Sequence, residues 1–302
     1  MKALIIGYGS IGQRHYEVLS SLSIFETIDI VTKRQIKDLN TYECLELVSD
    51  LSVYNYFVIS SETNKHFEQL KILENKVVDK LIFCEKPLFE SKKVLESSQN
   101  HIFVGYVLRY HPLLQKLKTL LENDKAIYAN VKCGQYLPNW RPNTDYRDCY
   151  SAHKNQGGGV LLDLSHEIDY VQWLLGPIVE LKSYQLHQSD LEIDSDDLVL
   201  IIGKTNRAIV TNISIDYISK STHRNIRIET NKNSFDLDLI NNVLVATNKE
   251  GDSKKFSSPE LKRNDSFKDM HCDILGLQEY ACTFEEGISV METISTIQEQ
   301  NR

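Results

Sequence analysis

The sequence lacks closely spaced cysteines, long apolar runs and an excess of basic residues. Its six cysteines, at positions 44, 84, 133, 149, 272 and 282, form no CxxC pair, so we expect reduced thiols in a cytoplasmic protein. No apolar stretch approaches the ~20 residues that span a bilayer, and no signal-peptide pattern follows Met1. The formal net charge of −8 argues against a dedicated nucleic-acid binder. His223 and His271 lack metal-ligand spacing, so no metal site is expected.

The chain is longer than one hydrophobic core usually serves. At 302 residues, with 41% apolar and 25% charged residues, it has the composition of an ordinary globular protein. It shows no internal repeat or low-complexity segment. We therefore predict two domains, a dinucleotide-binding domain at 1–112 and a substrate-binding and oligomerisation domain at 113–302.

A glycine motif follows the first strand-like run. Residues 2–7 have the pattern of a short buried strand, and GYGSIG then opens a helical pattern that continues to Leu22. In this context GxGxxG indicates a dinucleotide fold, because glycines permit a tight turn, a close approach to the pyrophosphate and close helix packing. A glycine-rich turn without a ligand is the alternative. The motif predicts cofactor contacts at Gly7, Gly9, Ser10, Ile11 and Gly12.

The second predicted strand, 27–31, ends in Thr32-Lys33-Arg34. An NAD-specific site places an acidic residue near this position to bind the ribose hydroxyls. A hydroxyl and two cations instead attract a 2′-phosphate, so the cofactor is predicted to be NAD or NADP, with NADP favoured. The alternative is a solvated basic loop.

Polar residues follow three further strands, at 56–59, 81–84 and 101–104. Ligands bind at the carboxyl ends of strands in open α/β sheets. The segment after the first of these is predicted to contact the cofactor through Ser60, Ser61, Thr63, Asn64 and His66. The next leads into Glu85-Lys86-Pro87, where proline restricts Lys86 to an extended backbone and so aims it. A surface turn is the alternative for that tripeptide.

An acid–base pair lies in the stretch 157–176, which reads GGGVLLDLSHEIDYVQWLLG. Its glycines precede a predicted helix that Gly176-Pro177 ends. Asp163 and His166 are three residues apart and therefore share a helix face. They resemble an acid–base pair presented to a ligand. A charge favoured by the helix dipole and a satisfied core histidine are the alternatives.

The ordered motifs GYGSIG, SSETNKH, CEKPL, GYVLRYHP and GGG…D..HEID…WLLG resemble the Gfo/Idh/MocA family, from Lys2 to about Gly176. This family comprises NAD(P)-dependent sugar oxidoreductases related to glucose–fructose oxidoreductase and inositol dehydrogenase. The resemblance implies an α/β chain: an N-terminal Rossmann domain with a doubly wound parallel sheet, and a C-terminal α+β domain with a large open, mainly antiparallel sheet. It also implies a homo-oligomer, a dimer or tetramer formed through that sheet.

The resemblance also implies roles for single residues. Lys86 and His166 would be catalytic with Asp163 beside them, and Glu85 would touch the nicotinamide ribose. Thr63 and Asn64 would lie along the cofactor. Many members space the aspartate four residues before the histidine rather than three, which leaves open which group is the base. A non-catalytic protein that senses a dinucleotide or sugar on the same fold is the alternative function.

The second half of the chain supplies a long loop and a series of strands. The loop 137–150 is rich in aromatic residues and arginines and is predicted to bind a polyhydroxylated or anionic substrate. Its phrase YLPNWRP…DYR resembles a branch of the family associated with bacterial surface sugars. An ordered structural loop is the alternative. Short strand patterns follow from Val179, and helices are predicted at 267–284 and 289–300. The candidate substrate-binding residues are Arg109, Arg141, Tyr146 and Arg147.

Overall fold

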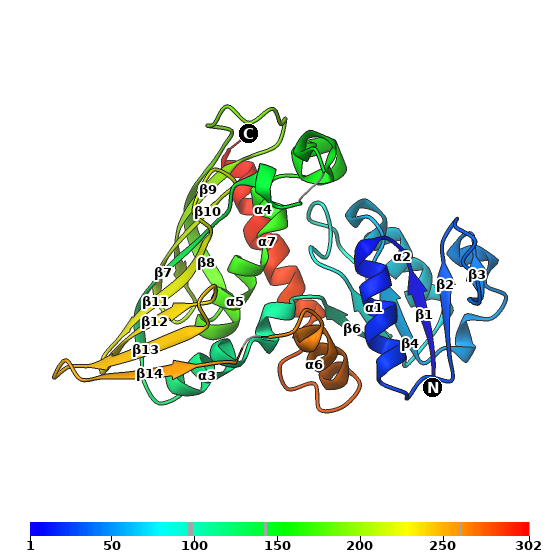
Figure 1. Cartoon of the computed structure of the whole chain (residues 1–302), viewed down its shortest axis with the longest axis horizontal. Helices are drawn as coiled ribbons and strands as arrows, with labels where there is room; N and C mark the ends of the chain where they lie inside the picture. Colours follow the sequence, from blue (N-terminus) through cyan, green and yellow to red (C-terminus); the bar gives the residue numbers. More distant parts are fainter. Residues whose placement is uncertain (96–98, 142–143, 260, 302) are drawn as a thin grey trace. The chain divides into compact units, whose positions relative to one another are not determined.

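The computed structural model describes residues 1–95, 99–141, 144–259 and 261–301 (Figure 1). The strands are β1 (Lys2–Ile6), β2 (Thr27–Val31), β3 (Thr41–Tyr42), β4 (Tyr56–Ile59), β5 (Leu81–Cys84), β6 (His101–Val104), β7 (Ala126–Gly134), β8 (Ile178–Leu186), β9 (Leu198–Thr205), β10 (Val210–Asp216), β11 (His223–Thr230), β12 (Asn233–Asp238), β13 (Val243–Asn248), β14 (Ser253–Ser257) and β15 (Cys282–Thr283). The helices are α1 (Ser10–Ser21), α2 (Thr63–Lys76), α3 (Pro112–Leu121), α4 (Val160–Asp163), α5 (His166–Leu175), α6 (Asp265–Ile274) and α7 (Phe284–Gln300). Among the described residues, no helix is long and apolar enough to cross a bilayer.

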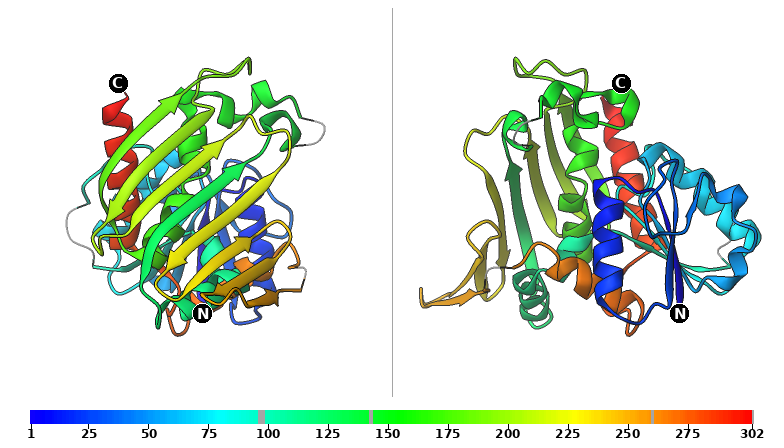
Figure 2. Two further views of the ribbon diagram at one scale, coloured as in Figure 1. Left: turned by 90° about the vertical axis from the view of Figure 1, so that its left-hand side faces the viewer. Right: turned by 45° about the vertical axis from the view of Figure 1, so that its right-hand side comes forward.

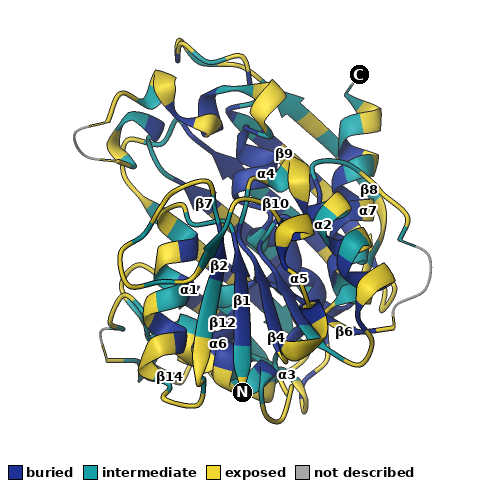
Figure 3. Ribbon diagram, turned by 90° about the vertical axis from the view of Figure 1, so that its right-hand side faces the viewer, coloured by how far each residue is buried: buried dark blue, intermediate teal, exposed yellow. Residues whose placement is uncertain are grey.

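The chain forms two compact units, and the first comprises Met1–Tyr110 and Leu261–Ile288. Its sheet has the strand order β15-β6-β5-β4-β1-β2-β3, with parallel pairing throughout except at β15. β1 and β4 are short apolar runs that are buried on both faces, as expected for central parallel strands (Figure 3). The order β3-β2-β1-β4-β5-β6 is that of a Rossmann sheet, so the predicted N-terminal fold is confirmed.

The segment 261–288 packs in the first unit, although it follows the second unit's strands in sequence. Met270 and Ile274 of α6 lie in the same apolar core as Tyr56 and Phe83, and β15 pairs with β6. The sequence-based division at residue 112 places this segment in the C-terminal domain, so the observed units differ from it here.

The helix predicted over 267–284 is wrong in its second half. α6 ends at Ile274, and Gln278 has a φ of 57°. The carboxylate of Asp273 accepts the backbone N–H groups of Glu279 and Tyr280 at 2.8 and 2.9 Å. The chain therefore turns out of the helix and continues as β15 before α7 begins.

The second unit, His111–Glu260 and Ser289–Arg302, is built on an eight-stranded sheet of order β14-β13-β12-β11-β7-β10-β9-β8. All its pairs are antiparallel except β7–β10, which confirms the predicted open, mainly antiparallel sheet. α4 packs on β9 and β10, and α5 on β7 and β10. The opposite face is seen in the left view of Figure 2, where no helix crosses the strands.

The helix predicted from Leu161 to Leu175 is broken into α4 and α5. Leu164 has φ −101° and ψ 24°, outside the helical range, and α5 restarts at His166. Asp163 and His166 therefore belong to two helices rather than to one face of one helix. Gly159, with φ 116°, allows the sharp entry into α4, since a Cβ there would lie 2.3 Å from the Asp196 carboxylate.

Candidate functional site

The predicted cofactor residues follow one row of strand ends in the first unit. Residues paired in register end the five parallel strands on a common line: Val31, Ile6, Ile59, Cys84 and Val104. Successive strands are added on one side of β1 up to β3 and on its other side from β4 onward, so the strand order reverses between β1 and β4. Ligands bind at such a point in doubly wound sheets. The residues immediately after this row are Thr32, Gly7, Ser60, Glu85 and Gly105.

The glycine turn has the geometry that a dinucleotide phosphate needs. Gly7 has φ 99°, and a Cβ on Gly12 would lie 2.2 Å from the Gly7 carbonyl oxygen, so both positions require glycine. A Cβ on Gly9 would meet no atom within 4 Å. Gly9 is exposed and precedes the N-terminus of α1, where Ser10 and Ile11 present backbone N–H groups. An anion can therefore approach the backbone closely at Gly9, and the residues fit a pyrophosphate.

Basic side chains lie after β2. Thr32 accepts the Arg34 backbone N–H at its Oγ1 at 3.3 Å, and Lys33 and Arg34 are exposed. Arg34 Nη1 lies 3.4 Å from the Tyr8 carbonyl oxygen within the glycine turn. The structure thus brings this basic pair to the same end of the sheet as the GxGxxG motif.

The segment after β4 contains both exposed and buried groups. Ser60 donates to the Gly7 carbonyl at 3.0 Å and Ser61 to Gln69 at 2.6 Å, while Thr63 and Asn64 open α2. His66 is buried, and its nitrogens face backbone carbonyls: Nδ1 is 3.2 Å from that of Pro87, and Nε2 is 3.2 Å from that of Ser61. Burial lowers the pKa of His66, so the neutral ring donates to one of these carbonyls at a time. The visible contribution of His66 is to tie the Glu-Lys-Pro loop to α2.

Glu85 and Lys86 follow β5. Glu85 is 8% exposed; its Oε2 accepts the Lys86 backbone N–H at 3.0 Å, and its Oε1 lies 2.9 Å from Nε2 of His15. The Lys86–Pro87 bond is cis. The Lys86 side chain is partly exposed, as a group that meets a ligand must be.

In the second unit, Asp163 ends α4 as the acceptor of three hydroxyl groups. Tyr150, Ser151 and Tyr217 each donate to its carboxylate at 2.6 Å. Asp163 is 5% exposed, and burial followed by its charge raises the pKa of Tyr150 and Tyr217. The carboxylate thus joins the loop before the glycines to the residue that follows β10.

His166 begins α5 and lies against Arg224 of β11. Arg224 Nη2 donates to Nε2 of His166 at 2.6 Å. Glu167 approaches both groups, with its Oε1 3.0 Å from His166 Nε2 and 3.1 Å from Arg224 Nε. These are ion-pair distances rather than aligned hydrogen bonds, because the same oxygen has no partner that meets hydrogen-bond geometry. An arginine cannot accept, so the geometry places the lone pair of His166 at Nε2.

The charges of this cluster are buried and compensated. Burial on its own raises the pKa of Glu167, but Arg224 and His166 outweigh it and hold that pKa at about 2. Tyr170 donates to the other Glu167 oxygen. Arg224 Nε also donates to Cys133 Sγ at 3.3 Å, and burial raises the pKa of that thiol to about 12. A fixed carboxylate–guanidinium pair therefore lies against the imidazole of His166.

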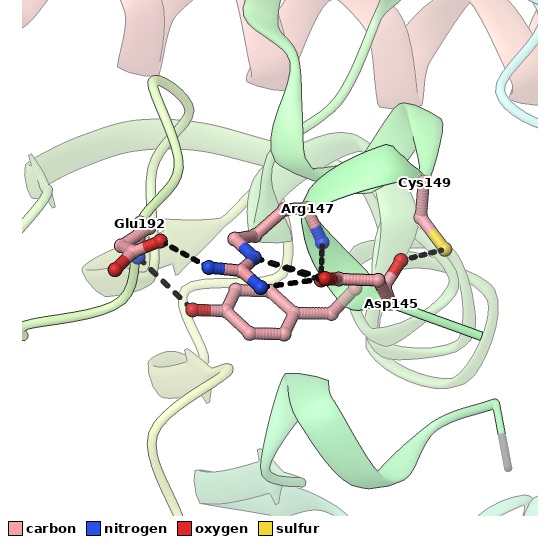
Figure 4. Close-up of polar contacts among 5 residues, drawn as sticks. Asp145, Arg147, Cys149 and Glu192 are labelled. Carbon is pink, nitrogen blue, oxygen red and sulfur yellow. Dashed lines mark hydrogen bonds and ion pairs between the residues drawn. The ribbon is translucent and has the colours of Figure 1, made fainter. Parts of the chain in front are cut away.

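The predicted substrate-binding residues are engaged by protein groups to different degrees. Arg147 binds both oxygens of Asp145 and donates to Glu192 at 2.7 Å, which ties the loop to the segment between β8 and β9 (Figure 4). Tyr146 accepts the Glu192 backbone N–H at 3.2 Å through its hydroxyl. Arg109 belongs to the first unit, where it is 2% exposed and paired with Glu286 at 2.7 Å.

Arg141 lies with its guanidinium over the ring of Tyr150, 5.4 Å from the centroid. A cavity of about 10 Å³ is lined by Trp140, Arg141, Tyr146 and Ser151. That volume holds about one water molecule, so a sugar cannot enter it without movement of the loop. Residues 142 and 143 of the predicted loop lie outside the described residues.

Sequence reasoning missed Glu167 and Arg224 beside His166, and His15 and His271 behind Glu85. Glu167 was visible in the HEID motif, but the spacing assigns it no partner. Arg224 lies 58 residues beyond His166, and only the pairing of β11 with β7 brings it into place. Within the ranges that the structure describes, no group of three His, Cys, Asp or Glu side chains could hold a metal ion.

Comparisons with known proteins address the fold and the family. The family described as "Oxidoreductase family, C-terminal alpha/beta domain" of the Gfo/Idh/MocA group matches residues 126–302. UDP-N-acetylglucosamine 3-dehydrogenase GnnA from Acidithiobacillus ferrooxidans aligns at TM-score 0.78 and 16% identity, over 100% of this chain and 97% of its own. Levoglucosan dehydrogenase with NADH and levoglucosan aligns at 0.82 and 15%, over 99% and 96%.

A third structure, an oxidoreductase from Agrobacterium radiobacter in complex with NAD⁺, L-tartaric acid and magnesium, aligns at TM-score 0.84 and 14% identity, over 99% of this chain and 96% of its own. At these identities the structures show a shared fold. A comparison with curated protein sequences gives no match.

Proposed function

The chain belongs to the Gfo/Idh/MocA family of oxidoreductases, and on that premise we propose that it is an NAD(P)-dependent sugar dehydrogenase or reductase. It transfers a hydride between nicotinamide and a hydroxyl or keto carbon of a sugar, sugar nucleotide or cyclitol. The observation that carries this proposal is the presence of a dinucleotide turn at Gly7–Gly12 together with a partly exposed histidine, His166, whose Nε2 faces a donor.

The first unit supplies the cofactor site in this proposal. The Gly9 backbone and the N-terminus of α1 hold the pyrophosphate, and the Ser60, Thr63, Asn64 and Glu85 region lies along the dinucleotide. Lys33 and Arg34 bind a 2′-phosphate, so NADP is favoured over NAD. When bound, the nicotinamide accepts the hydride in oxidation and returns it in reduction.

The proton is handled by His166. Its Nε2 lone pair, which Arg224 now occupies, accepts the substrate hydroxyl proton in oxidation and returns it in reduction. Lys86 binds the substrate oxygen and favours its partly ionised state. Asp163 anchors the end of α4, just before His166, through its three hydroxyl partners. In this proposal it does not act through the contact with His166 that the three-residue spacing implies.

The substrate is proposed to be a sugar or sugar nucleotide. Two of the structural neighbours are named for such substrates, UDP-N-acetylglucosamine and levoglucosan. Arg141 and Tyr146 line the loop cavity and are the first candidates to contact the substrate, while Arg147 and Arg109 are already paired with carboxylates. A role in bacterial surface-sugar synthesis within the cytoplasm belongs to the same proposal.

We also propose that a second copy of the chain covers the open sheet face. Tyr184 and Ile202, on neighbouring strands of that face, are 66% and 63% exposed, and Leu200 lies beside them. Exposed apolar patches of this kind mark interfaces. Sedimentation of wild type and Ile202→Asp tests this: a dimer or tetramer that the substitution dissociates is expected, and a monomeric wild type contradicts it.

The activity is tested by following absorbance at 340 nm with NADPH or NADH and a panel of sugar nucleotides, sugars and cyclitols. Lys86→Ala and His166→Ala should each lower turnover about 10²- to 10⁴-fold, as expected for loss of positioned acid–base or electrostatic help. The double variant should lose less turnover than the product of the two single losses if both residues act on one substrate. Dinucleotide binding with no turnover across the panel would support the sensor alternative.

A further inference from the structure

A chain of buried polar side chains runs through the first unit behind Glu85. The Tyr56 hydroxyl lies 2.8 Å from Nδ1 of His271, and Nε2 of His271 lies 2.8 Å from Nδ1 of His15. Nε2 of His15 lies 2.9 Å from Oε1 of Glu85. Both histidines and Tyr56 are 0% exposed and Glu85 is 8% exposed. Four polar groups, from β4, α6, α1 and the loop after β5, are therefore joined end to end inside an apolar core.

The proton positions follow from what each group can do. If Glu85 is ionised it only accepts, so Nε2 of His15 carries the proton and Nδ1 accepts from Nε2–H of His271. Nδ1 of His271 then accepts from the Tyr56 hydroxyl, and every atom of the chain is satisfied. In the reverse direction the Tyr56 hydroxyl proton would have no acceptor among the described residues. An orphaned buried donor is costly, so the direction from Tyr56 to Glu85 is favoured.

We propose that His15 and His271 are positioning residues that hold Glu85 as an oriented carboxylate for the nicotinamide ribose. This rests on the proposed function, in which Glu85 contacts the cofactor. In this proposal α6, which follows the second unit's strands in sequence, contributes to the cofactor site of the first unit.

Three features support the inference that these hydrogen-bonded side chains position Glu85 rather than conduct protons. They end at Tyr56, which is fully buried, so no proton can leave to solvent at that end. Phe83 packs against both rings, at 4.9 Å from His15 and 5.2 Å from His271 between centroids, and limits their rotation. Burial also keeps the pKa of His271 well below its ordinary value. The His271 ring is therefore a fixed, neutral donor and acceptor.

The absence of a side chain at Gly105 leaves room for the Glu85 carboxylate in this position. A Cβ there would lie 3.2 Å from the Glu85 carboxylate and 2.8 Å from Phe83. The carboxylate thus occupies space that glycine leaves open, with His15 on one oxygen and the Lys86 backbone N–H on the other. Its orientation is determined from both sides.

The test substitutes His271 and measures dinucleotide dissociation constants by nicotinamide fluorescence. His271→Phe removes the donor to His15, and the affinity should fall about tenfold or more, the effect of one lost charge-assisted hydrogen-bond arrangement. His271→Gln keeps an amide donor at the corresponding position and should restore most of the affinity. Met270→Ala is the matched control, because Met270 is a buried neighbour of His271 on α6 that takes no part in these hydrogen bonds. This substitution should lower the melting temperature without weakening cofactor binding.

A second measurement does not depend on the cofactor. Nitrogen NMR of the histidine rings in the wild type should show His15 and His271 as neutral rings protonated at Nε2. Protonation of His15 at Nδ1, or unchanged dinucleotide affinity in folded His271→Phe, would overturn the inference. If His271→Phe does not fold, His271→Gln, Tyr56→Phe and the wild-type spectrum still decide it. A wild-type protein that binds neither dinucleotide would refute the proposed function. The ring signals would still report whether the hydrogen bonds from Tyr56 to Glu85 are present.

Discussion

Arg224 donates a hydrogen bond from Nη2 to Nε2 of His166 at 2.6 Å. An unpaired arginine at this distance would oppose protonation of the imidazole, but Glu167 lies within 3.1 Å of both groups and offsets the charge. The acceptor atom of His166, which Arg224 occupies in this structure, therefore lies in a locally neutral setting. This is what a group that takes up and returns one proton requires.

The Arg224–Glu167 pair should be important for stability. Arg224→Met leaves the fully buried Glu167 carboxylate without its guanidinium, and loss of one partner of a buried pair costs about 3–5 kcal/mol. Urea denaturation measures this. Arg227→Met on the same strand is the control, because that arginine is exposed and surface pairs contribute about 0–1 kcal/mol. Equal effects of the two substitutions would contradict the prediction.

Glu167 should make the stability of the protein sensitive to acid. Its folded pKa, about 2, lies below the ~4.3 of an unfolded glutamate. The stabilisation is therefore fully present above pH ~4.3 and is lost as the pH falls towards 2. The difference in free energy of unfolding between wild type and Glu167→Gln should be largest at neutral pH and shrink across this window. A difference independent of pH would show that the carboxylate charge is not involved.

Substitutions at Asp163 and at His166 should have different effects, the first on stability and the second on turnover. Asp163→Ala leaves three buried or part-buried hydroxyls without their acceptor, and we expect a loss of about 3 kcal/mol or more in the free energy of unfolding. Tyr217→Phe removes one of these bonds and should cost less. His166→Ala should be nearly as stable as wild type but much slower. The assignment of Asp163 as an anchor fails if Asp163→Ala is as stable as Tyr217→Phe.

Gly9 and Gly12 should respond differently to the same added methyl group. The Gly12→Ala Cβ would collide with the Gly7 carbonyl, which should destabilise the fold by about 1–3 kcal/mol. The Gly9→Ala Cβ meets nothing in the protein, and φ is −77°, so the melting temperature should be unchanged. Dinucleotide affinity should nevertheless fall, because the methyl group occupies the space proposed for the phosphate. If Gly9→Ala binds the dinucleotide with wild-type affinity, the phosphate does not lie at Gly9.

The basic residues after β2 should discriminate between the two dinucleotides. Lys33→Ala and Arg34→Ala should weaken NADPH binding about tenfold each, as expected for loss of a charge-assisted contact to phosphate. NADH binding should change little, since it has no 2′-phosphate. Fluorescence titration with both dinucleotides measures the ratio. Parallel losses for NADPH and NADH would remove the basis for favouring NADP.

The sequence by itself determined the local elements and their order. Short, mainly apolar runs between turn signals located β1, β4, β5 and β6, because a strand buried on both faces has few alternatives. The glycine spacing at 7–12 indicated the dinucleotide turn, because a Cβ at Gly7 or Gly12 would strike backbone atoms and Gly9 leaves space for a ligand. These patterns can be recognised within a few residues of sequence.

Only the tertiary structure decided the partners of the ionisable groups. His15 and His271 are 256 residues apart, and Arg224 meets His166 through strand pairing, so no local pattern could connect them. The helix that periodicity predicts is broken between Asp163 and His166, where the Asp163 carboxylate accepts from the nearby Tyr150 and Ser151 and from the distant Tyr217. Hydrogen bonds between distant segments depend on how the elements pack, and packing is a property of the whole fold.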